Sequence, residues 1–387
     1  MTRVSYIAIG AFLLLPMMQA NAQSSGQGFV IKGTIKGIGS GVVLMFSGDA
    51  RSMVDSAIIV KGQFVMRGKI GLPERRAFTI VPGNWSFRGF VEDTVMTFAI
   101  DTTGAQHQYS GKKDYPMIWE IKQTGSKMAD VYAQYVRETG QTDALSLIKK
   151  IGIAKNKTEV ANIWHQMDSL RGPMFARQKI WVENYIHQYP ASIVGVYMFN
   201  ELYGFGVYRD ASINDLQSAI DRFSGAAKNS IYYQQLTQVV ANSKNTQANS
   251  PAPDFTLQKR DKTKFTLSAT RGGYTMLDFW ASWCVPCRAA IPKWKKVYAK
   301  YHLKGFNIVS VSTDESWKKW LTALDKEKMP WVQVIDEYSS AHSKGKVSEL
   351  FPSRNIPFYV LLDKEGKVLL ASGDEEAMNK KIAEVLP

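Results

Sequence analysis

The sequence has very little cysteine and histidine: two Cys and five His in 387 residues. Two cysteines exclude a disulfide-stapled scaffold, and no further Cys exists to complete a zinc site with Cys284 and Cys287. His165 and His187 lack a second ligand at metal spacing. The composition, 45% hydrophobic and 21% charged, also excludes disordered and collagen-like chains. We therefore expect two or three globular domains, with no metal and no cofactor.

Acidic residues are outnumbered, with 34 Asp and Glu against 48 Lys and Arg and a net charge of +14. Such a charge could attract nucleic acid, anionic lipid or acidic proteins. The sequence contains no dense Lys/Arg block and no basic stripe interleaved with aromatic residues. The lysines between 293 and 304 spread around a predicted helix and are interpreted as a solvated face. We expect no nucleic-acid partner.

Charge is almost absent from residues 1–22, where Arg3 is the only charged side chain. The following stretch from Val4 to Met18 is mostly apolar, and Ala20 and Ala22 are small residues at the two cleavage positions. A membrane span needs about 20 apolar residues, so a cleaved signal peptide is favoured over an anchor. We predict a periplasmic protein, which contacts the membrane only if this segment remains uncleaved.

Hydrophobic periodicity divides the rest of the chain. From Phe29 to about Asp101 apolar residues alternate with polar ones, with turn residues between the runs, which predicts an antiparallel β-domain over residues 23–115. The spacing then becomes helical, as for Trp181 and Tyr185, and predicts a helical region over 116–241. Aromatic and Met residues in this region are interpreted as core.

Residues 242–253 are polar, lack periodicity and end with Pro251 and Pro253, which predicts a linker. Strand and helix signals alternate over 254–387. The predicted strands are 274–280, 306–311, 358–362 and 368–370, and the predicted helices are 286–301, 316–326 and 375–385. This alternation predicts a mixed α/β layer.

Both cysteines lie where a predicted buried strand meets the start of a helix. Unpaired backbone N–H groups and the helix dipole favour a thiolate at this place, so the pKa of Cys284 should fall and Cys284 should be the nucleophile. Cys287, one turn deeper, should resolve the mixed disulfide. A staple this short would constrain little, so we interpret the pair as a redox-active disulfide.

The resolving thiol must lose its proton when it attacks, which requires a base. Asp278 lies six residues before Cys284, between Leu277 and Phe279. A carboxyl group in that setting would be desolvated, which would raise its pKa into the range of a useful base. The alternative interpretation is a structural Asp on a strand edge.

Residues 279–288 (FWASWCVPCR) resemble the exported thiol-disulfide oxidoreductases of the TlpA/ResA group in the thioredoxin superfamily. Residues 252–257 resemble the usual first strand of that group, and Ile356-Pro357-Phe358 matches its cis-proline position. The resemblance covers about 251–387 and implies a thioredoxin-like α/β domain, with a central mixed sheet flanked by helices. Residues 54–56 and 62–64 resemble a β-domain of unassigned role (DUF4369-like) that precedes such domains in Bacteroidota.

The resemblance also implies roles for three residues outside the cysteine pair. Pro357 would shape the site, the backbone of Ile356 would bind the substrate chain like an added strand, and Trp283 would pack over the nucleophile as an apolar lip. The exported group often has an acidic residue at the position of Ala290 and often none at Asp278, so the proton should pass through Asp278 here.

We therefore predict an exported thiol-disulfide oxidoreductase that reduces disulfides in other proteins and is itself reduced by an unidentified thiol donor. A very acidic Cys284 thiol would instead make the protein a disulfide-forming oxidant. A third hypothesis is a scaffold whose thioredoxin-like part only recognises partners. A peroxiredoxin would need Thr or Ser where this chain has Ala281, and a copper carrier of this fold would need three residues between its cysteines.

Overall fold

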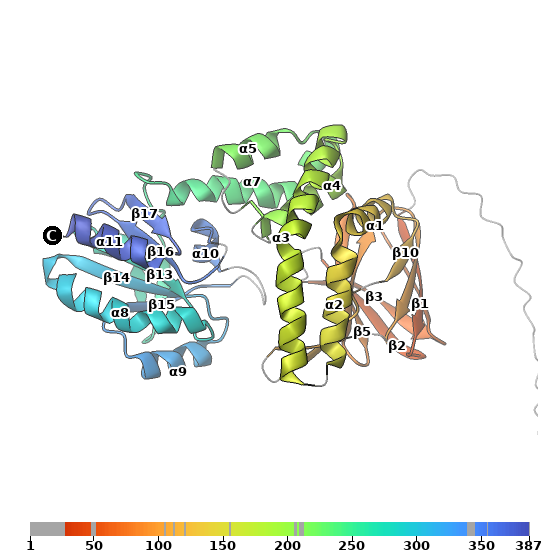
Figure 1. Ribbon diagram of the computed structural model, residues 1–387, viewed down its shortest axis with the longest axis horizontal. Coiled ribbons are helices and arrows are strands. Elements are labelled where there is room, and N and C mark those ends of the chain that lie inside the picture. Colours follow the sequence, from red (N-terminus) through yellow and green to blue (C-terminus); the bar gives the residue numbers. More distant parts are fainter. Residues whose placement is uncertain are drawn as a thin grey trace, which may run out of the picture.

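The computed structural model describes residues 28–47, 52–103, 106–110, 113–119, 121–154, 156–204, 207–208, 213–338, 345–353 and 355–386. The predicted signal peptide lies outside these residues. Three parts follow one another along the long axis of the molecule: a β-sheet, a group of helices and a mixed sheet with its own helices (Figure 1). Within the described ranges, no helix combines the length and apolarity needed to cross a bilayer.

The first part is one sheet with strand order β10-β7-β1-β4-β3-β2-β5-β6-β9-β8. Its strands are β1 (Phe29–Lys36), β2 (Ser40–Phe46), β3 (Met53–Val60), β4 (Gln63–Gly68), β5 (Glu74–Val81), β6 (Trp85–Val91), β7 (Val95–Asp101), β8 (Gln106–Ser110), β9 (Lys113–Met117) and β10 (Lys122–Thr124). The prediction of an antiparallel domain is wrong at two pairs, because β1 pairs in parallel with β7 and β6 with β9. Strands β2 to β6 form the long crossover that a parallel pair requires.

Alternating burial along these strands builds a core inside the curved sheet. In β1, Phe29, Ile31 and Ile35 point inward and are buried, as their period-two spacing requires. Phe78 stacks on Phe87 with ring centroids 4.9 Å apart. The sheet therefore encloses an apolar interior of its own.

The helices begin at Lys127, later than the predicted residue 116, because β9 and β10 still belong to the sheet. They are α1 (Lys127–Thr139), α2 (Gln141–Ile153), α3 (Lys157–Gln188), α4 (Ile193–Gly204), α5 (Ile213–Asp221), α6 (Gly225–Lys228) and α7 (Ile231–Ser243). Ser126 caps α1 by accepting from the backbone N–H of Ala129 at 3.0 Å. Buried residues of α4, including Val196, Met198 and Phe199, form the centre of their common core.

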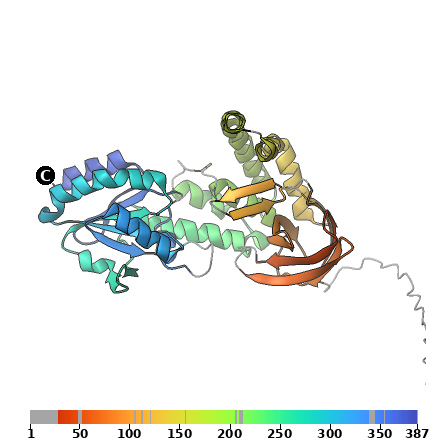
Figure 2. The same ribbon diagram turned by 90° about the horizontal axis from the view of Figure 1, so that it is seen from below.

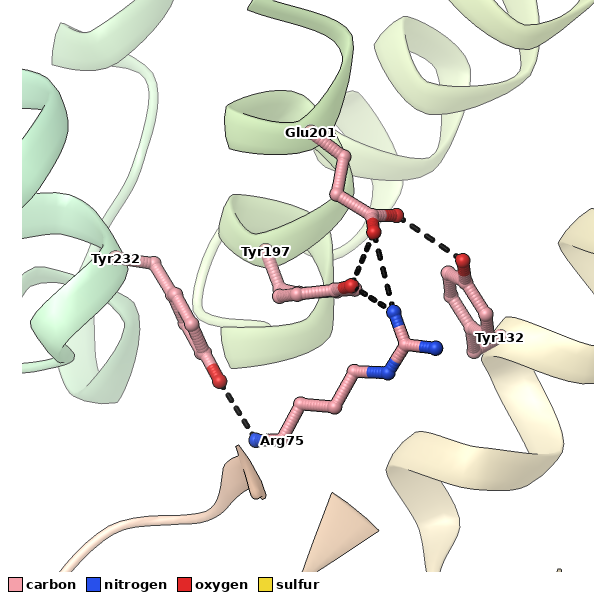
Figure 3. A network of polar contacts seen from close by, with 5 residues as sticks. All are labelled: Arg75, Tyr132, Tyr197, Glu201 and Tyr232. Carbon is pink, nitrogen blue, oxygen red and sulfur yellow. Dashed lines mark hydrogen bonds and ion pairs between the residues drawn. The ribbon is translucent and has the colours of Figure 1, made fainter. Parts of the chain in front are cut away.

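A half-buried polar cluster joins the sheet to the helices (Figure 3). Arg75 on β5 forms an ion pair with Glu201 on α4, with Nη1 and Oε1 3.1 Å apart, and also donates to the hydroxyl of Tyr197. Tyr132 on α1 donates to Glu201 Oε2 at 3.1 Å, and Tyr232 on α7 accepts from the backbone N–H of Arg75 at 2.6 Å. Three helices and a strand thus converge on one neutralised charge pair, which we name the Arg75 cluster.

The C-terminal part has the predicted thioredoxin-like α/β fold. Its sheet order is β12-β11-β15-β14-β13-β16-β17, with β13, β14 and β15 parallel and β16 and β17 antiparallel to their neighbours. The strands are β11 (Thr256–Lys259), β12 (Lys264–Thr266), β13 (Tyr274–Trp280), β14 (Phe306–Ser312), β15 (Val332–Ile335), β16 (Phe358–Leu362) and β17 (Val368–Ser372).

Helices cover both faces of this sheet. They are α8 (Val285–Tyr301), α9 (Trp317–Glu327), α10 (Lys346–Leu350) and α11 (Glu375–Val385), with short 3-10 turns η2 (Leu267–Thr270) and η3 (His302–Lys304). Figure 2 shows α8 and α11 side by side over one face, and their buried residues share a core with β13 and β16. Val347 of α10 packs into the core of the opposite face, with Leu277 and Phe279.

The segment predicted as a linker, residues 242–253, is folded against the C-terminal part. Its first two residues end α7, and Lys244–Thr246 form the 3-10 turn η1. Its polar side chains bond to backbone carbonyl groups at the end of α10, which are otherwise unsatisfied at a helix terminus. The bonds are Asn242 Nδ2 to Glu349 O at 2.8 Å and Asn245 Nδ2 to Leu350 O at 2.9 Å, and the backbone N–H of Asn249 bonds to Val368 O at 2.8 Å.

Candidate functional site

The two cysteines lie at the start of α8, directly after the central strand β13. Cys284 is the N-cap residue of the helix, and its Sγ accepts from the backbone N–H of Cys287 at 3.2 Å. The helix-start position predicted for the nucleophile is therefore present. The sulfur atoms of Cys284 and Cys287 form a disulfide, and each residue is 3% exposed. The structure thus shows the oxidised form of the pair.

Ile356 and Pro357 come from a distant part of the chain and lie against the cysteines. The peptide bond between them is cis, and the carbonyl oxygen of Ile356 is 3.7 Å from Cys284 Sγ. This backbone carbonyl is in place beside the sulfur expected to react first. The role of Ile356 in binding a substrate chain stays a prediction.

Trp283 lies at the surface beside Cys284, and its role as an apolar lip packed over the nucleophile stays a prediction. Its side chain is 64% exposed, and that of Val285 is 78% exposed. In the turn between β13 and α8, Ala281 and Cys284 point into the core, so the side chains beside Cys284 point to solvent. The cysteines are therefore flanked by an exposed apolar surface.

Asp278 lies on β13, between Ser310 of β14 and Tyr359 of β16. Because β13 has neighbours on both sides, Asp278 does not lie on a strand edge, and its role as a base stays a prediction. The residue is 4% exposed and accepts from Ser310 Oγ at 2.7 Å. Burial raises the pKa of Asp278 from 3.8 to about 6, against the opposing effect of the Ser310 hydrogen bond.

The carboxyl group of Asp278 faces the first turns of α8. Met276, two residues before Asp278, packs with Ala290 of this helix, and Trp280, two residues after it, packs with Cys287. Side chains two apart on a strand share a face, so Asp278 lies under the helix segment that carries the inner cysteine. This placement suits a group that exchanges a proton with Cys287.

Sequence reasoning missed Asp314, which holds the turn before Cys284. This buried carboxylate accepts from the backbone N–H of Ser282 at 2.8 Å, from Ser282 Oγ at 2.6 Å and from Ser312 Oγ at 2.8 Å. Asp314 follows β14 at the same sheet edge where β13 ends. That position after a predicted parallel strand was the available signal.

Within the described residues, no three His, Cys, Asp or Glu side chains gather as a metal site. The site consists of a dithiol pair at a helix start, a cis-proline loop and a buried carboxylate, all on the same mixed sheet. Fold and site together define a thioredoxin-like redox domain.

Residues 247–386 match the family described as Redoxin. Residues 29–132 match a domain of unknown function, DUF4369. Both assignments agree with the resemblances seen in the sequence.

Known proteins align with the C-terminal part. The thiol-disulfide oxidoreductase ResA of Oceanobacillus iheyensis is 34% identical over 126 residues, which are 30% of this chain and 60% of that protein. The chain thus spans less than two thirds of that curated relative. A solved thiol-disulfide oxidoreductase from Bacteroides fragilis is 31% identical, with 35% of this chain and 100% of that chain covered and a TM-score of 0.33. The thioredoxin domain of a Bacteroides vulgatus thiol-disulfide oxidoreductase is 27% identical, with 36% and 99% covered and a TM-score of 0.34.

Proposed function

We propose that the protein is a thiol-disulfide oxidoreductase that reduces disulfides in exported proteins. The observation that carries this proposal is the position of Cys284, whose sulfur caps α8 and accepts the N–H of Cys287 while the Ile356 carbonyl lies beside it. A sulfur at this position is stabilised as thiolate by the N–H groups of the first helical turn. Thiolate is the form that attacks disulfides.

The first step forms a mixed disulfide. In the reduced protein, the Cys284 thiolate attacks one sulfur of the substrate disulfide, forms a bond to it and expels the other substrate sulfur as a thiolate, which takes a proton from water. The exposed side chains of Trp283 and Val285 offer an apolar surface for the polypeptide around that disulfide. The backbone of Ile356, next to Cys284, offers hydrogen bonds of the kind made by an added strand.

The second step releases the substrate. The Cys287 thiol gives its proton to the Asp278 carboxylate, and the resulting thiolate attacks Cys284 Sγ and expels the second substrate thiolate, which is then protonated. Two electrons have passed from the cysteine pair to the substrate, and the pair remains as the disulfide seen in the structure. A thiol donor must reduce this disulfide before the next cycle.

The place of action follows from the N-terminal segment. Residues 1–22 carry the signal-peptide pattern, which supports a periplasmic protein.

The proposed domain boundaries follow the observed elements, with the redox domain in residues 254–387. We place the β-domain before residue 125 and the helical region from Lys127 to Ser243, since β10 ends at Thr124 and α7 at Ser243.

A trapping experiment tests the proposal. Cys287→Ala leaves the nucleophile but removes the resolving thiol, so this variant should accumulate covalent, reductant-sensitive adducts with disulfide-containing proteins such as insulin. Cys284→Ala is the matched control and should form none. The unchanged protein should reduce insulin with a dithiol donor. No adducts with Cys287→Ala, together with no insulin reduction, would support the scaffold hypothesis and overturn the enzyme.

A further inference from the structure

Two buried residues, Ser310 and Trp331, form a hydrogen-bond chain that ends at Asp278. The reaction steps described above do not use this chain. Ser310 on β14 is fully buried, and its Oγ donates to Asp278 Oδ2 at 2.7 Å. The indole Nε1 of Trp331, which is 6% exposed and directly precedes β15, donates to the same Ser310 Oγ at 2.8 Å. The chain thus runs from β15 through β14 to β13.

The direction of each hydrogen bond is fixed by chemistry. An indole N–H only donates, so it must use a lone pair of the Ser310 oxygen. The hydroxyl hydrogen of Ser310 is then free to point at Asp278. This arrangement stabilises the carboxylate form of Asp278, which burial alone disfavours.

In the described part of the sheet, the titratable neighbour of Asp278 is Tyr359 on β16, and Cys287 on α8 is held in the disulfide and does not titrate in the oxidised protein. Burial, and then the charge of Asp278, hold the pKa of Tyr359 above its ordinary value, so Tyr359 stays a neutral phenol near pH 7. Burial and the Ser310 hydrogen bond are the two influences on the pKa of Asp278, and they oppose each other. The Ser310 hydrogen bond is therefore the contact that lowers the pKa of Asp278 against the effect of burial.

We propose that Trp331 and Ser310 are positioning residues for the proton-accepting carboxylate of Asp278, linked as a chain from Trp331 Nε1 through Ser310 Oγ to Asp278 Oδ2. This inference rests on the proposed reductase function, because it assigns the chain to the second step of that reaction. Without the chain, Asp278 would hold its proton to a higher pH, so that near pH 6 to 7 a smaller fraction of the protein would have a carboxylate available to take the Cys287 proton.

The experiment measures the pH at which Asp278 titrates, by the infrared carbonyl band of its protonated form in the oxidised protein. The difference spectrum against Asp278→Asn assigns that band and requires no enzymatic activity. In the unchanged protein the midpoint should lie near pH 6. In Ser310→Ala it should rise by about one pH unit, the usual effect of losing one hydroxyl hydrogen bond. Trp331→Phe should raise it by a smaller amount.

Ser312→Ala is the matched control. Ser312 is also a fully buried serine on β14, and its hydroxyl donates to a different carboxylate, Asp314 Oδ2, at 2.8 Å while accepting the Asp314 N–H at 3.1 Å. Its removal costs the same kind of bond and should leave the Asp278 midpoint unmoved. An unmoved midpoint in Ser310→Ala, or an equal shift in Ser312→Ala, would overturn the inference. If Ser310→Ala does not fold, the midpoint of Trp331→Phe decides in the same way.

The acidic limb of the pH profile for insulin reduction separates the two proposals. Asp278→Asn should remove the part of this limb that comes from Asp278 and leave the part that comes from the Cys284 thiol, and Ser310→Ala should move the Asp278 part to higher pH. If the unchanged protein reduces no insulin, the proposed function itself is wrong. If the unchanged protein reduces insulin but Ser310→Ala does not move the acidic limb of its pH profile, only this inference is wrong and the proposed function stands.

Discussion

The molecule withdraws carboxyl groups from solvent in two contrasting ways, partly at Glu201 and almost completely at Asp278. In the Arg75 cluster, Glu201 meets a guanidinium group, and burial is offset by an ion pair and tyrosine hydroxyl groups. Asp278 has no cation as a partner in the described residues and receives one hydrogen bond from Ser310. The ion pair of Glu201 holds a strand and helices together, whereas burial without a cation raises the pKa of Asp278 to about 6. The first arrangement suits architecture, and the second suits proton transfer.

The largest effect is expected from breaking the ion pair. Arg75→Met leaves the half-buried Glu201 without its cation and should destabilise the N-terminal half by about 3 kcal/mol, the lower end of the range for removing one partner of a buried pair, because both side chains remain partly exposed. Hydrogen exchange should accelerate in β5, α1 and α4 and remain unchanged in β13 and β14. Lys36→Met breaks the exposed pair with Asp101 and should change nothing measurable. Equal losses of stability in Arg75→Met and Lys36→Met would contradict the view that the Arg75 pair, unlike the exposed Lys36 pair, holds the sheet and the helices together.

Next in size is the pH dependence of stability at Asp278. Its pKa is raised in the folded protein, so between about pH 4 and pH 6 the folded state holds a proton that the unfolded state has lost, and stability falls as pH rises. Asp278→Asn removes this loss and should be more stable than the unchanged protein at pH 8 by about 2 to 3 kcal/mol. Denaturation at pH 4 and pH 8 measures the difference. Parallel stability curves for the two proteins would refute it.

A smaller effect is expected at Asp314, a third kind of buried carboxylate with three donors. Asp314→Asn presents an amide N–H₂ group to Ser282 and should cost about 1 to 3 kcal/mol, because buried donors lose their acceptor. Thermal unfolding of the C-terminal part and exchange of the Ser282 amide measure this. An unchanged exchange rate at Ser282 would show that Asp314 does not hold the turn before Cys284.

The smallest effect concerns the contact between the helices and the redox domain. Asn245→Ala removes the hydrogen bond to Leu350 O and should cost about 1 kcal/mol or less. Proteolysis between residues 244 and 253 should become faster. Asn242→Ala loses a similar but more exposed bond and should have a weaker effect. The reverse ranking would count against this docking contact.

Local patterns predicted the redox domain well. The strand over 274–280 is correct at both ends because β13 is apolar and fully enclosed, and the following helix was placed within one residue. The helix-start position of Cys284 and the burial of Asp278 follow from the same stretch of sequence. The cis peptide at Pro357 came from family resemblance, since no local pattern distinguishes cis from trans.

Long-range pairing accounts for what the sequence did not reveal. Periodicity shows that β1 and β7 are strands, but their parallel pairing depends on the path of the chain between them. Polar residues after α7 looked like a linker because their partners are carbonyl groups more than 100 residues away. Asp314 was overlooked for the same reason, because two of its three hydrogen bonds come from Ser282, which is 32 residues away.

The position of β1 inside its sheet has a practical consequence for anyone who produces this protein. The first strand of the described residues, β1, has neighbours on both sides, β4 and β7, and begins one residue after Gly28. A Cβ atom at residue 28 would lie 1.8 Å from the carbonyl oxygen of Gly68. Expression plasmids should therefore retain Gly28 and place any affinity tag or start codon upstream of it.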